Sequence, residues 1–402
     1  MAITIVDSPA LYSSMHDDLW FVSSSTNAGT TNFKFVYDVI VNGNLVARSK
    51  VFPSPSGNYG VFNASPIVRA YATNYFEPSG NSILVASNDK LKVNYTLQIG
   101  EEVSGVVTTN LASGNYSAYN FYPPLFADMI AVKNDIPLVL SSYYDNLLIE
   151  NFTDDWLTER DTDEITIEFG DNFYASYFRK TGGTYSANLE ILNPNGTIAQ
   201  TITNVISLSG EFNLFNLQSG HLNTWAGSNV ITDQTYGYNF YLTRGAAVSR
   251  KLKFRQRCYP KYRQINLHFL NRLGGFDTMK FALVNRRRSE FQRSTYRRND
   301  WQLNGSQMSN VDSYNRYNET ALNYAIQHKD KFNLKSDYVT EQDYTWLGQL
   351  VASSICYIEV LGAYFPVIIA DSNYEYKVQN ADKLFNFEID IEVSKYINSQ
   401  FR

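Results

Sequence analysis

Residues 33–51 read FKFVYDVIVNGNLVARSKV, and this stretch decides the fold class. Successive side chains of a strand point to opposite faces, so strict alternation predicts a strand with one buried face. The apolar residues that alternate here are Phe33, Phe35, Tyr37, Val39 and Val41. Asn42-Gly43-Asn44 supplies a tight turn, because Asn and Gly tolerate a left-handed backbone. Residues 45–51 then return as a second strand, so the sequence predicts a β-hairpin.

Similar strands recur outward from this hairpin along most of the chain. Further strands are expected at 83–99 (two strands around Asn88-Asp89), 165–169, 189–198 (around a turn at Asn193–Gly196), 238–242, 252–255, 265–270 and 279–284. The chain has 402 residues, which is too long for one core. Its 30 Tyr and 25 Phe favour strands, while Asn favours the turns between them. We therefore expect a mainly β protein, with β-sandwich-like domains at 1–140 and 141–300.

The last hundred residues mix a helix with strands. Thr340 to Asp343 fits a capping box, and the apolar residues after it are spaced as on one helical face, which predicts a helix over 341–353. Strands are expected at 355–360, 365–369, 374–378 and 384–393. Alternation in the last strand places Glu388, Asp390 and Glu392 on the face opposite its apolar residues. These features predict a small α+β domain over 301–402.

Charge is distributed very unevenly along the sequence. Residues 244–298 hold 16 basic and two acidic residues, a net charge of +14. Since the whole chain carries −5, the remainder carries −19. Residues 154–171 alone hold eight acids and one base. Acidic and basic residues therefore occupy separate blocks.

The basic block has three interpretations. It could bind nucleic acid through guanidinium contacts to phosphate, form a protein interface, or be the solvated face of strands. The acidic block favours the interface, because opposite patches on one chain suit head-to-tail contact between copies, although the same charges could meet within one protomer. The candidate interface residues are Arg286, Arg287, Arg288, Arg293, Arg297, Arg298, Asp154, Asp155, Asp161, Asp163 and Glu164.

Motifs for catalysis or cofactor binding are missing from the sequence. It has no phosphate-binding glycine motif, no HExxH and no GxSxG, and its four histidines lie far apart. We therefore expect no cofactor, no metal and no enzymatic activity. Cys258 lies among basic residues that could lower its pKa, but an unreactive thiol is the simpler interpretation. The apolar stretch 350–370 includes Glu359 and Pro366, so strand, turn, strand is expected there rather than a membrane span.

Three stretches resemble structural proteins of tailed bacteriophages of Bacteroidota, the crAss-like group in particular. They are residues 32–43 (NFKFVYDVIVNG), residues 265–277 (INLHFLNRLGGFD), and the C-terminal set DYTWLGQL (343–350), FPVII (365–369) and QFR (400–402). The resemblance implies a virion component of the tail or neck, such as a ring protein of the tail barrel. It further implies a cyclic homo-oligomer, of twelve copies or else six, that contacts other tail or portal-proximal proteins.

The expected function is therefore a non-enzymatic virion structural protein that assembles with itself, made in the host cytoplasm. DNA would pass such a ring with at most passive contact, and no membrane insertion is expected. One alternative is a receptor- or carbohydrate-binding protein at the tail tip or fibre anchor. Another is a depolymerase, for which Asp154 and Asp161 are candidate carboxylates.

Overall fold

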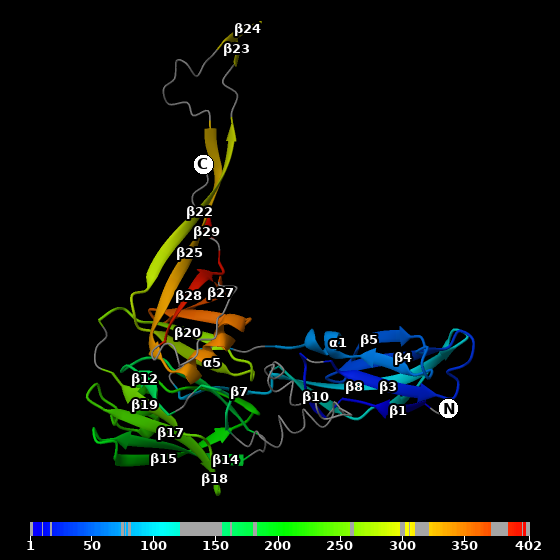
Figure 1. Ribbon diagram of the computed structural model, residues 1–402, viewed down its shortest axis with the longest axis horizontal. Coiled ribbons are helices and arrows are strands. Elements are labelled where there is room, and N and C mark those ends of the chain that lie inside the picture. Colours follow the sequence, from blue (N-terminus) through cyan, green and yellow to red (C-terminus); the bar gives the residue numbers. More distant parts are fainter. Residues whose placement is uncertain are drawn as a thin grey trace. The chain divides into compact units, whose positions relative to one another are not determined.

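The protein is mainly β, with several sheets and a few short helices (Figure 1). The computed structural model describes residues 3–9, 11–16, 18–73, 76, 78, 82–120, 155–160, 163–179, 183–257, 261–297, 302–304, 306–309, 321–370, 385–395 and 397–398. The chain divides into two compact units. Unit 1 comprises Met1–Tyr259 with Leu270–Thr278, and unit 2 comprises Pro260–Phe269 with Met279–Arg402.

The first sandwich of unit 1 is formed by the N-terminal strands. One sheet has three strands, β1 (Ile3–Asp7), β3 (Trp20–Ser25) and β6 (Gly60–Asn63). The other runs in the order β2 (Tyr12–Ser14), β10 (Tyr116–Tyr119), β8 (Lys92–Val103), β4 (Lys34–Val41) and β5 (Asn44–Val51), with β9 (Val106–Ala112) beside β8. A short helix, α1 (Ser65–Arg69), follows β6. The two sheets enclose an apolar core that includes Phe21, Tyr37 and Phe62.

The hairpin predicted at 33–51 is confirmed as β4 and β5. Its turn residues Asn42 and Gly43 have φ angles of 48° and 82°, the left-handed conformation that a two-residue loop requires. All five alternating apolar residues of the first strand are buried. The opposite face is not simply solvated, because Asp38 is also buried and accepts two hydrogen bonds from Arg48, at 2.6 and 2.7 Å. On that face, the buried carboxylate of Asp38 is therefore paired with the guanidinium of Arg48 instead of being hydrated.

The second sandwich of unit 1 has sheets of four and six strands. The smaller has the order β11 (Asp155–Trp156), β13 (Tyr174–Phe178), β16 (Phe212–Asn216) and β7 (Leu84–Asn88). The larger has the order β12 (Ile165–Ile167), β19 (Leu252–Gln256), β17 (Gly237–Arg244), β14 (Gly183–Leu192) and β15 (Ile198–Leu208), with β18 (Ala247–Val248) beside β17. Helix α4 (Ser219–Ala226) follows β16. The predicted hairpin around Asn193–Gly196 is confirmed as β14 and β15, with longer strands than expected.

The two strands expected around Asn88-Asp89 are present, but they belong to different sheets. β8 pairs with β4 in the first sandwich, whereas β7 pairs with β16 in the second. A small apolar cluster that includes Leu91, Tyr119 and Phe212 lies where the two sandwiches of unit 1 meet. Chain neighbours are thus separated, because each strand buries its apolar face in a different core.

Unit 2 is one large sheet with a helix on one face. The strand order is β21 (Phe276–Phe281), β20 (Ile265–Leu270), β26 (Cys356–Val360), β27 (Ala363–Ile369), β28 (Phe385–Val393), β25 (Ala321–Val339) and β22 (Arg286–Arg297), with β29 (Ile397–Asn398) pairing with β25. A two-stranded sheet is formed by β23 (Gln302–Asn304) and β24 (Gln307–Ser309). Helix α5 (Glu341–Ala352) packs Trp346, Leu347 and Leu350 into the core of this unit.

The predicted helix is confirmed in unit 2, since Thr340 caps α5 by accepting a hydrogen bond from the Asp343 backbone NH at 3.1 Å. The strand-turn-strand expected after it is confirmed by β26 and β27. β21 begins three residues earlier than predicted, directly after the turn at Gly274, whose φ is 79°. The strand expected at 374–378 lies outside the described residues.

The boundaries predicted at residues 140 and 300 can be compared with the sheets. Residue 140 lies outside the described residues. Residue 300 falls between β22 and β25, which pair from Arg286 opposite Asn333 to Arg297 opposite Ala321. The hairpin of β20 and β21 spans the boundary between the units, because residues 270–278 belong to unit 1. The three-domain partition stays a prediction.

Candidate interaction surface

The candidate arginines lie on β22, the last strand in the sheet of unit 2. β22 contains five Arg and one Glu in 12 residues, and nearly all of its side chains are exposed. Its only strand partner among the described residues is β25. β25 in turn pairs with β28 from Lys331 onward and with β29 at Gln327 and His328. In the described part of the chain, residues 321–326 therefore pair with β22 alone.

This two-stranded region, residues 293–297 of β22 with residues 321–326 of β25, is called the distal ribbon below. Figure 1 shows it extending beyond the other strands of the sheet of unit 2. Its exposed side chains include Arg293, Tyr296, Arg297 and Tyr324. The Tyr296 and Tyr324 rings lie 6.2 Å apart. The distal ribbon thus displays aromatic and cationic groups, and none of its residues belongs to an apolar core formed by the described part of the chain.

Asp330 is a buried acid of β25 that lies between the apolar core of unit 2 and the distal ribbon. Asp330 is only 8% exposed and accepts hydrogen bonds from Arg287 Nη2 at 2.5 Å and Ser289 Oγ at 2.6 Å. Burial tends to raise the pKa of Asp330, but the hydrogen bonds from Arg287 and Ser289 outweigh burial and lower it. Arg287 thus has a structural role, because its guanidinium neutralises the buried carboxylate of Asp330.

The outward face of the same sheet is a ladder of ion pairs. Lys331 bridges Glu290 at 2.6 Å and Glu392 at 2.8 Å, and Lys335 contacts Glu388 at 2.8 Å. The hydrogen bond from Lys335 lowers the pKa of Glu388, and those from Lys331 and Lys329 lower that of Glu392. The predicted placement of the acids of β28 opposite its apolar residues is confirmed.

The arginines of β22 differ in their electrostatic partners. Arg287 pairs with Asp330, Arg286 lies near enough to Glu388 to lower its pKa, and the Arg293 guanidinium lies 5.7 Å from the Phe291 ring centre. Arg288 and Arg297 contact no acid within the described ranges. Arg298 lies outside those ranges. Positive charge is therefore uncompensated mainly toward the distal end of β22.

Two of the candidate acids of unit 1, Asp155 and Asp163, have basic partners in the same unit. Asp155 accepts hydrogen bonds from the Arg250 backbone NH at 3.0 Å and from Arg250 Nε at 2.7 Å, and Asp163 pairs with Lys253 at 2.6 Å. Arg250 also binds the carbonyl of Trp156, whose fully buried indole donates back to the Arg250 carbonyl. Asp155 thus helps to hold β11 in place.

The remaining candidate acids are less constrained or not described. Glu164 is exposed, and the Asp163 side chain is largely exposed despite its ion pair. Asp154 and Asp161 lie outside the described residues. The assignment of the candidate acids and arginines to a subunit interface stays a prediction.

The acidic block and the basic block of the sequence do not each form a single surface. Arg250 and Lys253, from the first half of the basic block, neutralise acids of unit 1, whereas Arg286 to Arg297 belong to unit 2. Sequence reasoning had left pairing within one protomer open but did not name these pairs. It also missed Tyr324, because the partner strand of β22 could not be known.

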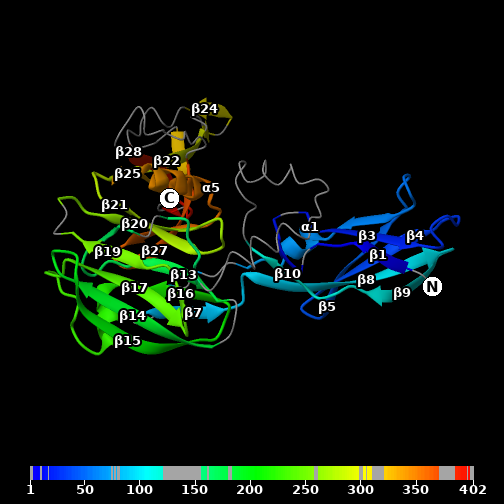
Figure 2. The same ribbon diagram turned by 60° about the horizontal axis from the view of Figure 1, so that its bottom comes forward.

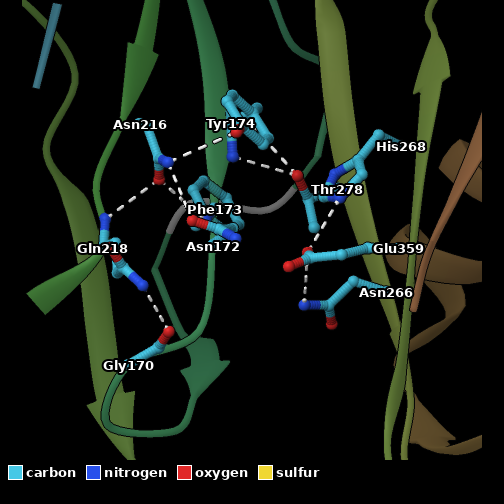
Figure 3. A network of polar contacts seen from close by, with 10 residues as sticks. All are labelled: Gly170, Asn172, Phe173, Tyr174, Asn216, Gln218, Asn266, His268, Thr278 and Glu359. Carbon is cyan, nitrogen blue, oxygen red and sulfur yellow. Dashed lines mark hydrogen bonds and ion pairs between the residues drawn. The ribbon is translucent and has the colours of Figure 1, made fainter. Parts of the chain in front are cut away.

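Figure 3 draws two networks of polar side chains, one in each unit. In unit 1, Asn216 Nδ2 donates to Asn172 Oδ1 at 2.8 Å, and Asn216 Oδ1 accepts from the Gln218 backbone NH at 3.2 Å. Asn216 therefore ties β16 to its neighbouring loop.

In unit 2, the carboxylate of Glu359 lies 3.2 Å from His268 Nε2 and 3.3 Å from Asn266 Nδ2. His268 is fully buried, and burial lowers its pKa although Glu359 acts in the opposite direction.

The described residues also bear on the expectations about metals, thiols and membrane spans. They contain no cluster of three metal-ligating side chains, and none of their helices is long and apolar enough to span a bilayer. Burial raises the pKa of Cys356 to about 12, so its thiol stays protonated. Cys258 lies outside the described part of the chain.

Comparisons with known proteins give no family for this chain. No family model and no curated protein matches it. Among solved structures, it is similar to dimeric latent PorU from Porphyromonas gingivalis, at 9% identity and a TM-score of 0.16 over 64% of this chain. The chain spans 20% of the length of that protein. A similarity this low supports no conclusion about fold or function.

Proposed function

We propose that this protein is a non-enzymatic structural protein whose copies assemble into a ring in the tail barrel or neck of a bacteriophage. The observation that carries the assembly role is the distal ribbon, which displays Arg293, Tyr296, Arg297 and Tyr324 outside the core that the described residues of unit 2 form. The phage setting and the ring of twelve or six copies come from the sequence resemblance. They are expectations of this proposal.

The physical argument begins with the instability of an isolated ribbon. A two-stranded sheet is marginally stable in water on its own, and three or more strands or a packed face are needed for independent stability. Tyr and Arg are enriched at protein interfaces, where the rings supply contact area and the guanidinium supplies directed hydrogen bonds. A neighbouring copy that covers the distal ribbon would supply the missing packing.

The charge of β22 favours contact between two different surfaces of the copies over contact of β22 with itself. The ribbon strand β22 carries a net charge of +4, so two copies of it repel each other and a negatively charged surface is the better partner. Glu164 and Asp163 are exposed acids of unit 1 that could contribute. Contact between different surfaces of identical copies is head to tail, and it closes into a ring when the rotation divides the circle. Exposed ion pairs contribute only about 0 to 1 kcal/mol each, so they would set the register while aromatic burial holds the copies.

Shortening the ribbon tests the proposal. In the variant, residues 293–326 are replaced by an Asn-Gly turn that joins Gln292 to Gln327, two residues that face each other in the ladder. The core of unit 2 lies on the other side of Asp330 and is untouched, so the urea midpoint of unfolding should stay close to that of the wild type. We expect the wild type to form multimers in native mass measurements and the shortened variant to lose them.

A control for loss of apolar surface is Val106→Ala, which removes an exposed side chain from β9 in unit 1. This variant should keep the mass distribution of the wild type. A shortened variant that still assembles would exclude the ribbon as the contact. A wild type that stays monomeric at all concentrations, and in particles reconstituted with tail proteins, would refute the assembly function itself.

A further inference from the structure

Strand β15 is a second open sheet edge, in unit 1. In the order β12-β19-β17-β14-β15 it is the last strand, and among the described residues it pairs with β14 alone. Figure 2 shows β17, β14 and β15 in succession, with β15 outermost. Alternate residues of an edge strand direct their backbone NH and CO groups away from the sheet. An 11-residue strand therefore offers a long row of unpaired backbone groups.

From Gln200 to Leu208, β15 has none of the features that usually prevent an edge from pairing, and its one register irregularity with β14 lies at its start, between Ile198 and Gln200. Natural edge strands are commonly short, charged, bulged or interrupted by proline. The sequence of β15, IAQTITNVISL, contains no charged residue and no proline. The edge strand β22 of unit 2, by contrast, carries five Arg and one Glu. The absence of protection at β15 points to an edge that is paired in the functional protein.

The side chains of β15 would allow a second strand to approach. Ile206 and Leu208 of its inner row are buried in the second sandwich and hold this end of the strand in place. The outer row of its regular part consists of small or β-branched residues, Thr201, Thr203, Val205 and Ser207. Val205 is 70% exposed, which leaves apolar surface for a neighbour to cover.

We propose that β15 pairs antiparallel with β15 of a second copy, across a twofold axis that passes through Thr203. Thr203 lies in the regular part of the strand, so this register pairs residues 200–206 of each copy and leaves out the irregularity at Ala199. It sets Thr203 against itself, Thr201 against Val205 and Gln200 against Ile206. Each outer-row residue meets an outer-row residue, so the two six-stranded sheets become continuous.

The side chains of β15 are compatible with those of a second, antiparallel β15, and this identifies a second copy as the partner. The outer-row pairs are small or β-branched side chains of similar size, which pack well across antiparallel strands, and none brings two charges together. Self-pairing of β22 would instead set a net +4 against +4. This twofold contact goes beyond the proposed function, because it needs neither the distal ribbon nor a ring.

Cysteine cross-linking tests both the contact and its register. Directly opposite Cβ atoms in an antiparallel pair lie about 4.5–5.5 Å apart, close enough for a disulfide after small adjustment. In a Cys258→Ser background, Thr203→Cys should form a disulfide-linked dimer under mild oxidation. Thr201→Cys should not, because its partner is Val205, whereas the double variant Thr201→Cys/Val205→Cys should cross-link. Equal cross-linking of Thr203→Cys and Thr201→Cys would overturn the proposed register.

Charge substitution tests the contact without a covalent bond. In Thr201→Lys/Val205→Lys, each lysine faces a lysine of the second copy, so we expect dimer dissociation to shift to at least tenfold higher protein concentration. Mixing this variant with Thr201→Glu/Val205→Glu should restore a mixed dimer. An unchanged urea midpoint in each variant would show that it folds. A lysine variant that dimerises like the wild type would refute the pairing.

Both tests should also be made in the ribbon-shortened protein. If the ring proposal is wrong and β15 pairs as described, the shortened protein still gives the Thr203→Cys dimer. If β15 does not pair, cross-linking fails in both backgrounds, whatever the ribbon does.

Discussion

Two long edge strands among the described residues, β15 in unit 1 and β22 in unit 2, expose opposite kinds of chemistry. β15 has no charge, and Ile206 and Leu208 of its inner row are buried in a sandwich core. β22 has a net charge of +4 and almost no buried side chain. One strand is held in place by apolar burial, while the other is held by its ladder with β25 and by ion pairs.

This difference shows what each edge can offer to a partner. A strand that is anchored by a buried row can leave its outer edge uncharged, and then it offers mainly backbone hydrogen bonds. A strand beyond the core offers side chains instead, and its arginines oppose pairing with its own copies. The comparison predicts that mutations in the inner row of β15 affect folding, whereas mutations on β22 affect assembly.

The largest effect is expected for Leu208→Ala on β15. Leu208 is 3% exposed in the core of the second sandwich, and Leu to Ala substitutions at such sites cost about 2 to 5 kcal/mol. Urea unfolding followed by fluorescence would measure the loss. Val205→Ala on the outer row of the same strand is the matched control, with an expected change under about 0.5 kcal/mol. Similar losses for both variants would mean that β15 is not anchored by one row.

An intermediate effect is expected for Asp330→Asn at the end of the core of unit 2. The substitution replaces the carboxylate that accepts bonds from Arg287 and Ser289, and it should cost about 1 kcal/mol, because Arg287 is largely exposed. Since folding lowers the pKa of Asp330, its contribution to stability is present above the pKa of the unfolded chain, about 3.9. That contribution is lost as the pH falls through the lower, folded-state pKa.

The unfolding midpoints of wild type and Asp330→Asn should therefore differ at pH 6 and converge toward pH 2. Chemical denaturation over this range would measure both curves. A constant difference at every pH would show that the charge of Asp330 does not stabilise the fold.

The smallest effect on folding is expected for Phe291→Ala on β22. Phe291 is 52% exposed, and its ring contacts His328 and Arg293 rather than the core, so the free energy of unfolding should change by less than about 1 kcal/mol. Phe281→Ala, at a fully buried phenylalanine of the same unit, should cost about 3 to 5 kcal/mol. Under conditions in which the protein multimerises, Phe291→Ala should weaken assembly more than it weakens folding. The reverse order would contradict the contrast between the strands.

Local features were the ones that the sequence predicted well. The hairpin at 33–51, the turn at Asn193–Gly196 and the helix capped by Thr340 depend on residues within about 20 positions of each other. Their periodicity and turn chemistry are visible without knowledge of distant partners. The predicted mainly β fold follows from the same signals and is confirmed.

Strand neighbours and charge partners could not be predicted in this way. β7 joins β16, more than 120 residues away, and Asp155 pairs with Arg250 across 95 residues. Many strands and bases of the chain satisfy the same local pattern, so the sequence leaves such pairings undetermined. The resemblance to phage structural proteins and the interface role of the arginines stay predictions for the same reason: they concern contacts that lie outside one chain.

The sequence alone determined that this chain forms strands, where several of its turns lie, and that positive charge concentrates before residue 298. The tertiary structure alone decided which strands end a sheet, and hence that β15 and the distal ribbon have open edges. The physical reason is that alternation and turn propensity are short-range properties of the backbone. Whether an edge is open depends on which distant apolar rows share a core, and this is decided only when the whole chain packs.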